Sequence, residues 1–471
     1  MGRGGSSALT EVDVLVAGGG PAGCTTAAAM AQLGLRTVIA DAGQDRRKQL
    51  AGELLHPVGV EELTTFGFSE VLRSGGAPIV GFAVVDGEKT ALLPYAPGNR
   101  GLGIEHHALI APLLDILEKR GEVEVRRRTR VALVSDGPEG VEVTLTRDGQ
   151  SERVRARMLV AADGRASPLR RALGIPERHD RLSTMIGVMV EAAALPHAGR
   201  GHLFIGGPAP VLAYPISETQ ARVMVDLPLG SSPERVRAEP AILSGVPEPL
   251  RQETLDALQR EAPLIASNDT RIMEHVYKGN VVLVGDAAGC CHPLSASGMA
   301  SAVRDARVLH GAMSSAGNDV PRALAAYART RRPANRTRIA LASSLYEAFS
   351  SGAGEMAALR SGLFRYWERS PTGTRISMSL LSTRETRMSV MAREYARVVV
   401  QGLMALGSGT VRTVRGPGRA VRAGALLVAS AVPHLRTAMA GAVEDRMLAL
   451  PAHVPAAGEP LEPSRASASR S

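Results

Sequence analysis

The chain has 471 residues, 45% hydrophobic and 21% charged, which excludes a disordered chain or a disulfide miniprotein. Lys and Arg exceed Asp and Glu by nine, but only 3% of the residues are aromatic. Aromatic side chains on which the bases of single-stranded nucleic acid could stack are therefore scarce, and we expect no nucleic-acid partner. The three Cys lack a CxxC spacing, which predicts reduced thiols and no metal. Residues 1–10 lack the apolar run of a signal peptide, so we expect a cytoplasmic location.

The first elements in chain order predict a β-α-β unit. The β-branched run 12–17 predicts a buried parallel strand, and the small apolar residues 24–33 predict a helix that packs closely on a sheet. Residues 37–40 predict a second strand, which ends at Asp41. This order of elements is typical of dinucleotide-binding proteins.

Three glycines between the first strand and the helix predict a phosphate site. Gly18 permits the tight turn, Gly20 lets the backbone approach a pyrophosphate, and Gly23 brings helix and strand together. The phosphates then meet the positive end of the helix dipole. Asp41 lies 23 residues after Gly18, where a carboxylate can accept hydrogen bonds from ribose hydroxyls. The motif alone does not decide between FAD and NAD.

Two further strand ends carry acidic loops. Residues 159–162 predict a strand that ends at Asp163, and residues 281–284 predict another that ends in Gly285 and Asp286. Because ligands bind at the carboxyl ends of strands in such folds, Asp286 is a candidate cofactor ligand. A helix is expected from about Met299.

These three motifs together resemble the FAD-dependent monooxygenases of the para-hydroxybenzoate hydroxylase type. Four stretches narrow the resemblance to the squalene monooxygenases (squalene epoxidases). They are GELLHPVGV at 52–60, PVLAYPI at 210–216, RVMVD at 222–226 and HPLSASGM at 292–299. The resemblance extends over about residues 13 to 346.

The resemblance implies FAD as cofactor and NADPH as the reductant of the flavin. The alternative electron donor is an external reductase. It places Asp286 at the ribityl chain and connects Asp163 with both FAD and NADPH. Further expected flavin contacts are Glu53, Gly298 and Met299. No catalytic side chain is assigned, although His56 is a candidate for lining the active site.

The implied fold is α/β, with a Rossmann-like FAD-binding domain interleaved with a β-rich substrate domain and followed by a helical C-terminal region. The FAD domain takes residues 1–75, 105–178 and 268–345. The substrate domain takes residues 76–104 and 179–267.

The implied reaction is epoxidation of an alkene by molecular oxygen through a C4a-hydroperoxyflavin. Squalene and a prenylated or polyene natural product are both candidate substrates, because Gln49 and His56 depart from the Arg and Gln that the family carries there. Aromatic hydroxylation and reduction of prenyl chains are the enzymatic alternatives. The alternative from another class is a non-enzymatic membrane-surface module.

The excess positive charge lies in one C-terminal segment. Residues 360–447 contain 14 Arg, no Lys and five acids, a net charge of +9 that equals that of the whole chain. The uncharged runs 398–411 and 423–435 are each shorter than the roughly 18 residues that span a bilayer. We therefore expect basic helices over 346–450 that contact a membrane peripherally. Residues 451–471 are rich in Pro, Ala and Ser and predict a flexible tail.

Overall fold

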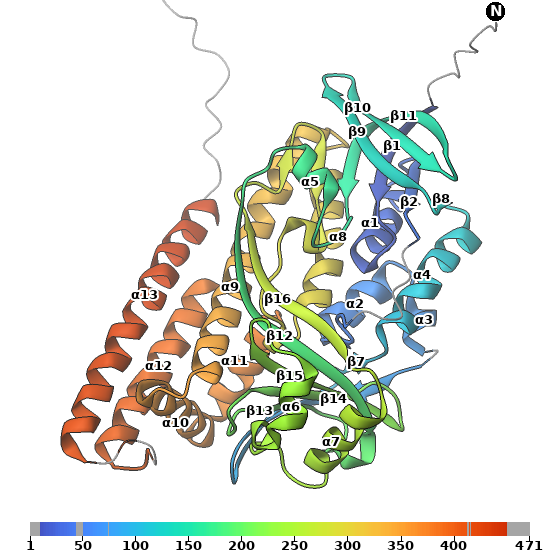
Figure 1. The fold of residues 1–471 in the computed structure, drawn as a ribbon. Helices are drawn as coiled ribbons and strands as arrows, with labels where there is room; N and C mark the ends of the chain where they lie inside the picture. Colours follow the sequence, from blue (N-terminus) through green and yellow to red (C-terminus); the bar gives the residue numbers. More distant parts are fainter. Residues whose placement is uncertain (1–9, 44–49, 74, 412–413, 415, 450–471) are drawn as a thin grey trace, which may run out of the picture.

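The computed structural model describes residues 10–43, 50–73, 75–411, 414 and 416–449. The expected flexible tail and Gln49 lie outside these residues. Figure 1 shows two sheet regions along one side and a stack of helices from the last third of the chain along the other.

The first sheet has eight strands within the described residues. Its centre is parallel: β1 (Thr10–Ala17) pairs with both β2 (Thr37–Asp41) and β11 (Gln150–Ala161). The remaining strands are β8 (Val123–Arg127), β9 (Arg130–Gly137), β10 (Gly140–Arg147), β17 (Tyr277–Lys278) and β18 (Val281–Leu283). The spatial order β17-β18-β11-β1-β2-β8, with β18, β11, β1 and β2 parallel, brings the four predicted strand ends to one edge. All four predicted strands are confirmed.

Helices cover this sheet because its strands are apolar on both faces. The chief one is α1 (Pro21–Ala31), which begins at Pro21 and buries Ala22 to Met30, all of them small except Met30. Small side chains let the helix lie close to β1, as predicted. The others are α2 (Pro57–Thr65), α3 (Ser69–Arg73), α4 (His106–Arg120), α5 (Pro168–Ala172) and α8 (Gly298–Ser315).

The second sheet has seven strands within the described chain, in the order β16-β12-β15-β14-β13-β5-β6. They are β5 (Gly81–Asp86), β6 (Lys89–Pro94), β12 (Glu177–Glu191), β13 (Gly201–Phe204), β14 (Val211–Pro215), β15 (Gln220–Pro228) and β16 (Leu264–Met273). One face packs on α6 (Pro233–Ala238) and α7 (Leu250–Arg260). The other face packs on the C-terminal helices. A small third sheet joins β3 (Leu54–Leu55), β7 (Gly101–Gly103) and β4 (Ala77–Ile79).

Alternation along β15 decides what each face of the second sheet presents. Ala221, Val223 and Val225 enter the core below α6 and α7. The side chains between them point to the opposite face. That face therefore receives Arg222 and Asp226, two charged residues that are both almost fully buried.

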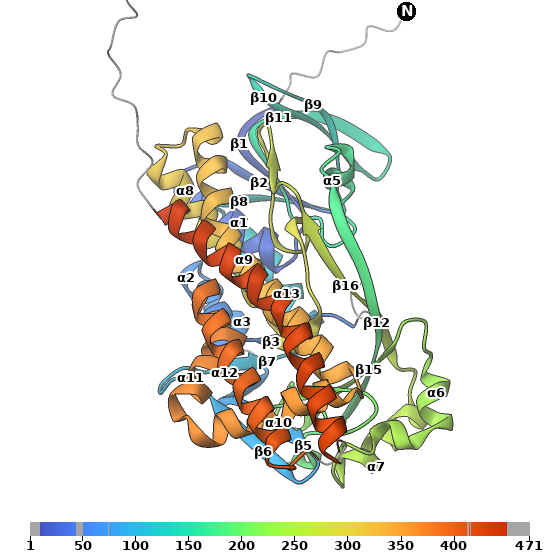
Figure 2. The same ribbon diagram turned by 90° about the vertical axis from the view of Figure 1, so that its left-hand side faces the viewer.

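The C-terminal third is helical, as predicted. Its helices are α9 (Val320–Ser350), α10 (Gly354–Arg369), α11 (Pro371–Leu381), α12 (Met388–Gly407) and α13 (Pro417–Ala449). Figure 2 shows α13 running lengthwise over the outer side of this stack, across α9. Its stretch Pro417–Val443 is a candidate membrane span by length and composition alone. The uncharged run 423–435 therefore understates the apolar length of this helix, because α13 continues past single Arg residues on both sides of the run.

Candidate cofactor and substrate site

The glycine-rich loop between β1 and α1 leaves no room for side chains. A Cβ on Gly23 would lie 1.8 Å from the carbonyl oxygen of Gly18, and one on Gly18 would lie 2.4 Å from that of Ala162. Gly18 also has φ +111°, which favours glycine. Gly20 caps α1 in extended conformation and makes no side-chain capping bond. The loop is thus a backbone cradle at a helix N-terminus, the kind of site that takes a pyrophosphate.

Asp41 lies where the sequence predicted it, at the end of β2. Its Oδ1 accepts a hydrogen bond of 2.9 Å from the backbone N–H of Gly19. The carboxylate is half-buried. Asp41 and the glycine loop therefore meet at the carboxyl edge of the sheet, which suits a nucleotide whose ribose and phosphates are neighbours.

The loop after β18 abuts the start of α1. Gly285 has φ +60°, and a Cβ there would lie 2.7 Å from the Ala22 Cβ. The backbone N–H of Gly285 donates to Asp305 Oδ2 at 2.8 Å, and Asp305 forms a buried ion pair with Arg331 at 2.8 Å. Asp305, itself paired with Arg331, therefore ties the loop to helices α8 and α9. The Asp286 carboxylate is 40% exposed beside the cradle, so it is accessible to a bound cofactor.

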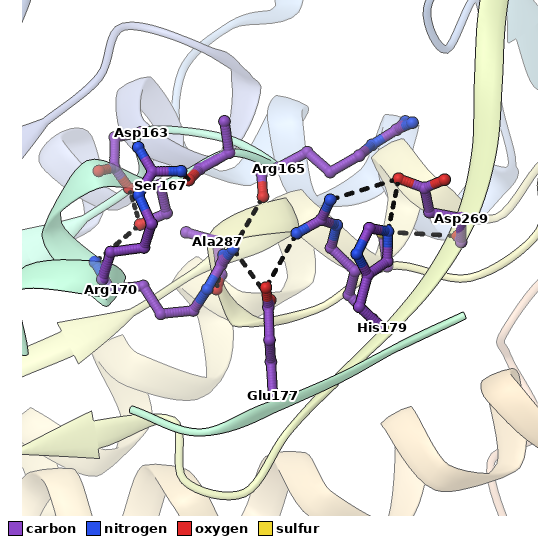
Figure 3. Close-up of polar contacts among 12 residues, drawn as sticks. Asp163, Arg165, Ser167, Arg170, Glu177, His179, Asp269 and Ala287 are labelled. Carbon is purple, nitrogen blue, oxygen red and sulfur yellow. Dashed lines mark hydrogen bonds and ion pairs between the residues drawn. The ribbon is translucent and has the colours of Figure 1, made fainter. Parts of the chain in front are cut away.

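Asp163 organises the start of α5. Its carboxylate accepts from Ser167 Oγ at 2.6 Å and from the backbone N–H of Leu169 at 3.0 Å (Figure 3). Burial raises the pKa of Asp163, against the lowering effect of these hydrogen bonds. The side chain shapes the loop, and its expected contact with FAD or NADPH stays a prediction.

An ion-pair network ties this loop to the second sheet. Glu177 lies between Arg170 and Arg271, at 3.0 Å from each (Figure 3). Arg271 and His179 both contact Asp269, at 3.4 and 3.1 Å. Arg170 also donates to the carbonyl of Ala287 at 3.0 Å. The two loops and the second sheet are therefore held in one arrangement.

Glu53 forms a buried bidentate ion pair. Both of its carboxylate oxygens lie 2.9 Å from the guanidinium group of Arg222 on β15. The two side chains are only 2% and 5% exposed. Glu53 therefore joins the segment before α2 to the second sheet, and its expected contact with the flavin stays a prediction. Arg222 received no role from the sequence, although a lone Arg within the apolar strand 221–225 is the signal that marks it.

His56 is fully buried between two partners. Its Nε2 lies 2.9 Å from the Ser295 carbonyl, which only accepts, so Nε2 carries the proton. Its Nδ1 therefore accepts from the Tyr95 hydroxyl at 2.7 Å. Burial lowers the pKa of His56 to about 4, so the ring is neutral at neutral pH. Tyr95 is a partner that the sequence did not reveal.

Two segments far apart in the sequence meet at this point. A Cβ on Gly52 would lie 2.9 Å from Met299 Cγ, and His56 contacts Ser295. Gly298 begins α8. The structure therefore brings the expected flavin contacts Glu53, Gly298 and Met299 into one neighbourhood.

His292 closes the same loop from the other side. Its Nδ1 accepts from the backbone N–H of Leu294 at 3.4 Å, so Nε2 donates to Asp226 Oδ2 at 3.2 Å. Ser183 and Asn268 donate to the other oxygen of Asp226, at 2.5 and 3.0 Å. Every member is buried. Asp226 thus fixes the loop on the second sheet in the same way that Arg222 fixes Glu53.

An apolar cavity lies among helices α9, α10, α11 and α12. Its volume is about 90 Å³, below the range of about 300–1,000 Å³ found for small-molecule sites. Phe349, Leu359 and Trp367 contribute to its wall. They belong to a continuous hydrophobic cluster that reaches Leu54 and Leu294 beside the loops just described. In the described part of the chain, no group of three His, Cys, Asp or Glu could hold a metal.

Comparison with known proteins agrees with this geometry. The family described as "FAD binding domain" matches residues 11–341. Squalene epoxidase 3 of Arabidopsis thaliana is 24% identical over 414 residues, 84% of this chain and 78% of the relative. Squalene monooxygenase of Mus musculus is 25% identical over 417 residues, 84% of this chain and 72% of the relative.

A solved structure has the same fold. A "probable FAD-dependent monooxygenase" of Pseudomonas aeruginosa superposes with a TM-score of 0.61 at 25% identity, covering 73% of this chain and 97% of that one. The chain belongs to the FAD-binding-domain family. Within it, the chain is an FAD-dependent monooxygenase similar to squalene monooxygenases. The predicted fold class and the FAD cofactor are confirmed.

Proposed function

We propose that this enzyme epoxidises one double bond of a long apolar alkene of the isoprenoid or polyene class. The balanced reaction is alkene, O₂, NADPH and H⁺ to epoxide, H₂O and NADP⁺. The observation that carries the proposal is the similarity to squalene monooxygenases over 84% of the chain, together with the continuous apolar cluster that extends from Leu54 and Leu294 to Trp367. An alkene requires placement and a dry environment more than it requires a charged partner.

The residues at the sheet edge fit FAD, which supplies the activation of oxygen when bound. Gly18, Gly20 and Gly23 provide the close backbone approach for the pyrophosphate, and Asp41 accepts from the ribose. Asp286 would accept from the ribityl chain, and its partly exposed carboxylate supports this role. These roles are assigned from position, and the chemistry of each group suits its task.

The loops around the flavin site are positioned by buried ion pairs and hydrogen bonds. Glu53 and Arg222 hold one side, and His292 and Asp226 hold the other. His56 is neutral and satisfied by Tyr95 and Ser295. We therefore assign His56 to positioning the loop, which excludes water from the reacting centre, and not to proton transfer. The first sheet then forms the FAD domain and the second sheet the substrate domain.

The experiment is NADPH oxidation by the FAD-loaded protein with three kinds of added compound: polyprenyl alkenes, aromatic acids and buffer alone. We expect the alkenes to stimulate oxidation at least severalfold over buffer, with epoxide formed in step with NADPH consumed. Stimulation by aromatic acids alone would favour hydroxylation. Alkenes that gain two hydrogens and no oxygen would favour a prenyl reductase.

We also propose that α13 lies on an anionic membrane surface. Exposed apolar side chains accompany exposed Arg residues along it: Val421, Leu426, Val428, Met439, Arg419, Arg422 and Arg436. Apolar burial and attraction to anionic lipid act together in such helices. The triple variant Arg419→Glu/Arg422→Glu/Arg436→Glu should lose most sedimentation with phosphatidylserine vesicles at low salt. Unchanged sedimentation, with circular dichroism showing an intact fold, would contradict this proposal.

A further inference from the structure

We infer that Arg165 is a positioning residue for FAD, which orients the Asp286 carboxylate by bridging the loop after β18 to strand β16. The inference rests on the proposed function, which assigns Asp286 to the ribityl chain. It starts from an ion pair of 3.8 Å between Arg165 Nε and Asp286 Oδ2. No other cation in the described part of the chain forms an ion pair with Asp286.

Arg165 is held in place through both its backbone and its side chain. It lies in the turn that follows β11, and its backbone carbonyl accepts from Arg170 at 3.0 Å. Its side chain extends away from Arg170 (Figure 3), and its Nη1 donates to the carbonyl of Ser267 on β16 at 2.9 Å. Because the guanidinium group is a rigid plane, the bond to Ser267 also sets the direction in which Nε faces Asp286.

The Asp286 side chain depends on this partner for its orientation. Its carboxylate is 40% exposed, and no hydrogen bond from the described residues reaches it. A side chain that orders only when a ligand arrives loses rotamer freedom, and this loss weakens binding. Arg165 imposes part of that order in advance. The ribityl chain then meets a carboxylate that is already oriented.

The exposure of this ion pair indicates that it contributes little to the stability of the fold. An ion pair as open to water as that of Arg165 and Asp286 stabilises a protein only slightly. The neighbouring pairs of Glu177 with Arg170 and with Arg271 are more buried, and they hold the loops to the second sheet. Loss of the Arg165 side chain should therefore leave the fold intact and change the affinity for FAD.

The test titrates the full-length protein, freed of FAD, with FAD and records the change in flavin fluorescence. We expect Arg165→Met to raise the dissociation constant about threefold to tenfold, the factor expected when one side chain must order on binding. Arg165→Lys should recover part of the affinity, because it keeps the charge but not the planar fork. Arg171→Met is the matched control, since Arg171 is exposed on α5 and donates to the carbonyl of Ala166 at 2.8 Å. It should bind FAD as the parent does.

A double-mutant cycle with Asp286→Ala separates positioning from direct contact. Asp286→Ala should weaken FAD binding by itself. Adding Arg165→Met to it should weaken binding little further, because no carboxylate is left for Arg165 to orient. Additive effects would mean that Arg165 acts on FAD without Asp286, and they would overturn the inference.

Equal affinities of the parent and Arg165→Met, with circular dichroism showing the same fold, would overturn the inference as well. So would a loss of affinity in Arg171→Met as large as that in Arg165→Met. An unchanged affinity in Asp286→Ala would contradict both the inference and the assignment of Asp286 to the ribityl chain.

The titration needs neither NADPH nor an alkene, and epoxide formation is measured separately by mass spectrometry. Coupling between Arg165 and Asp286, found with no epoxide from any alkene, would uphold the inference and contradict the proposed epoxidation.

Discussion

Breaking the ion pair between Glu53 and Arg222 should destabilise the protein more than any surface ion pair does. The two side chains are 2% and 5% exposed and share two hydrogen bonds of 2.9 Å. Glu53→Leu leaves the guanidinium group of Arg222 buried and unpaired. Removal of one partner from such a pair costs about 3–5 kcal/mol. We therefore expect Glu53→Leu to lower the free energy of unfolding by about that amount.

The double variant Glu53→Leu/Arg222→Met separates pairing from packing. Because two apolar side chains of similar volume leave no buried charge, it should recover most of the loss. A double-mutant cycle with Arg222→Met gives the coupling energy. The assay is urea unfolding followed by circular dichroism, with flavin release recorded in parallel.

A surface pair provides the control. Glu61 and Arg384 form an ion pair with side chains that are 50% and 44% exposed. Glu61→Leu should cost no more than about 1 kcal/mol. If Glu53→Leu costs no more than Glu61→Leu, the buried pair does not hold the loop to the second sheet, and the reasoning is refuted.

Three further predictions concern the cofactor loop, His56 and the second buried anchor. Gly23→Ala should abolish FAD retention, because its Cβ would lie 1.8 Å from the Gly18 oxygen, whereas Gly311→Ala, with nothing within 4 Å, should retain FAD; equal flavin absorbance would contradict this. His56, with a pKa of about 4 against 6.5 when unfolded, binds fewer protons folded than unfolded between these values. The free energy of unfolding should therefore fall as the pH drops from 6.5 to 4, by about 3 kcal/mol more than in His56→Gln. If urea unfolding gives the same pH dependence for the parent and for His56→Gln, this prediction is wrong. Asp226→Asn should shift the flavin absorption maximum by loosening the His292 loop, and Asp256→Asn, on the outer helix α7, should not.

The local elements could be predicted from the sequence because their signals are local. The run 12–17 is β-branched and meets a glycine turn, which indicates both the strand and its end. Asp41 and Asp286 follow buried strands directly, so the parallel sheet brings them to one edge. These inferences need only strand order and the direction of the chain.

The anchoring pairs could not be predicted because they depend on register. Glu53 and Arg222 are 169 positions apart, and they meet only because β15 turns its even-numbered side chains toward the loop. The partnership of His56 with Tyr95 likewise needs β6 to end beside α2. A single polar residue within an apolar strand marks such a pair but does not name its partner.

The cavity and α13 show two further limits. The cavity forms where four helices do not completely fill the space between them. The sequence pattern of each helix predicts its buried face, but it does not predict gaps between packed helices. Counting uncharged residues gave short segments, because Arg419, Arg422 and Arg436 interrupt them. The helix itself continues through these residues, since Arg is a good helix former.

The most direct test of the central claim is the origin of the oxygen in the product. The purified enzyme, carrying FAD, is supplied with NADPH, ¹⁸O₂ and a polyprenyl alkene, and the products are analysed by mass spectrometry. The account predicts an epoxide that contains one ¹⁸O atom. A product with oxygen from water, a product with two added hydrogens and no oxygen, or a protein that retains no flavin would contradict it.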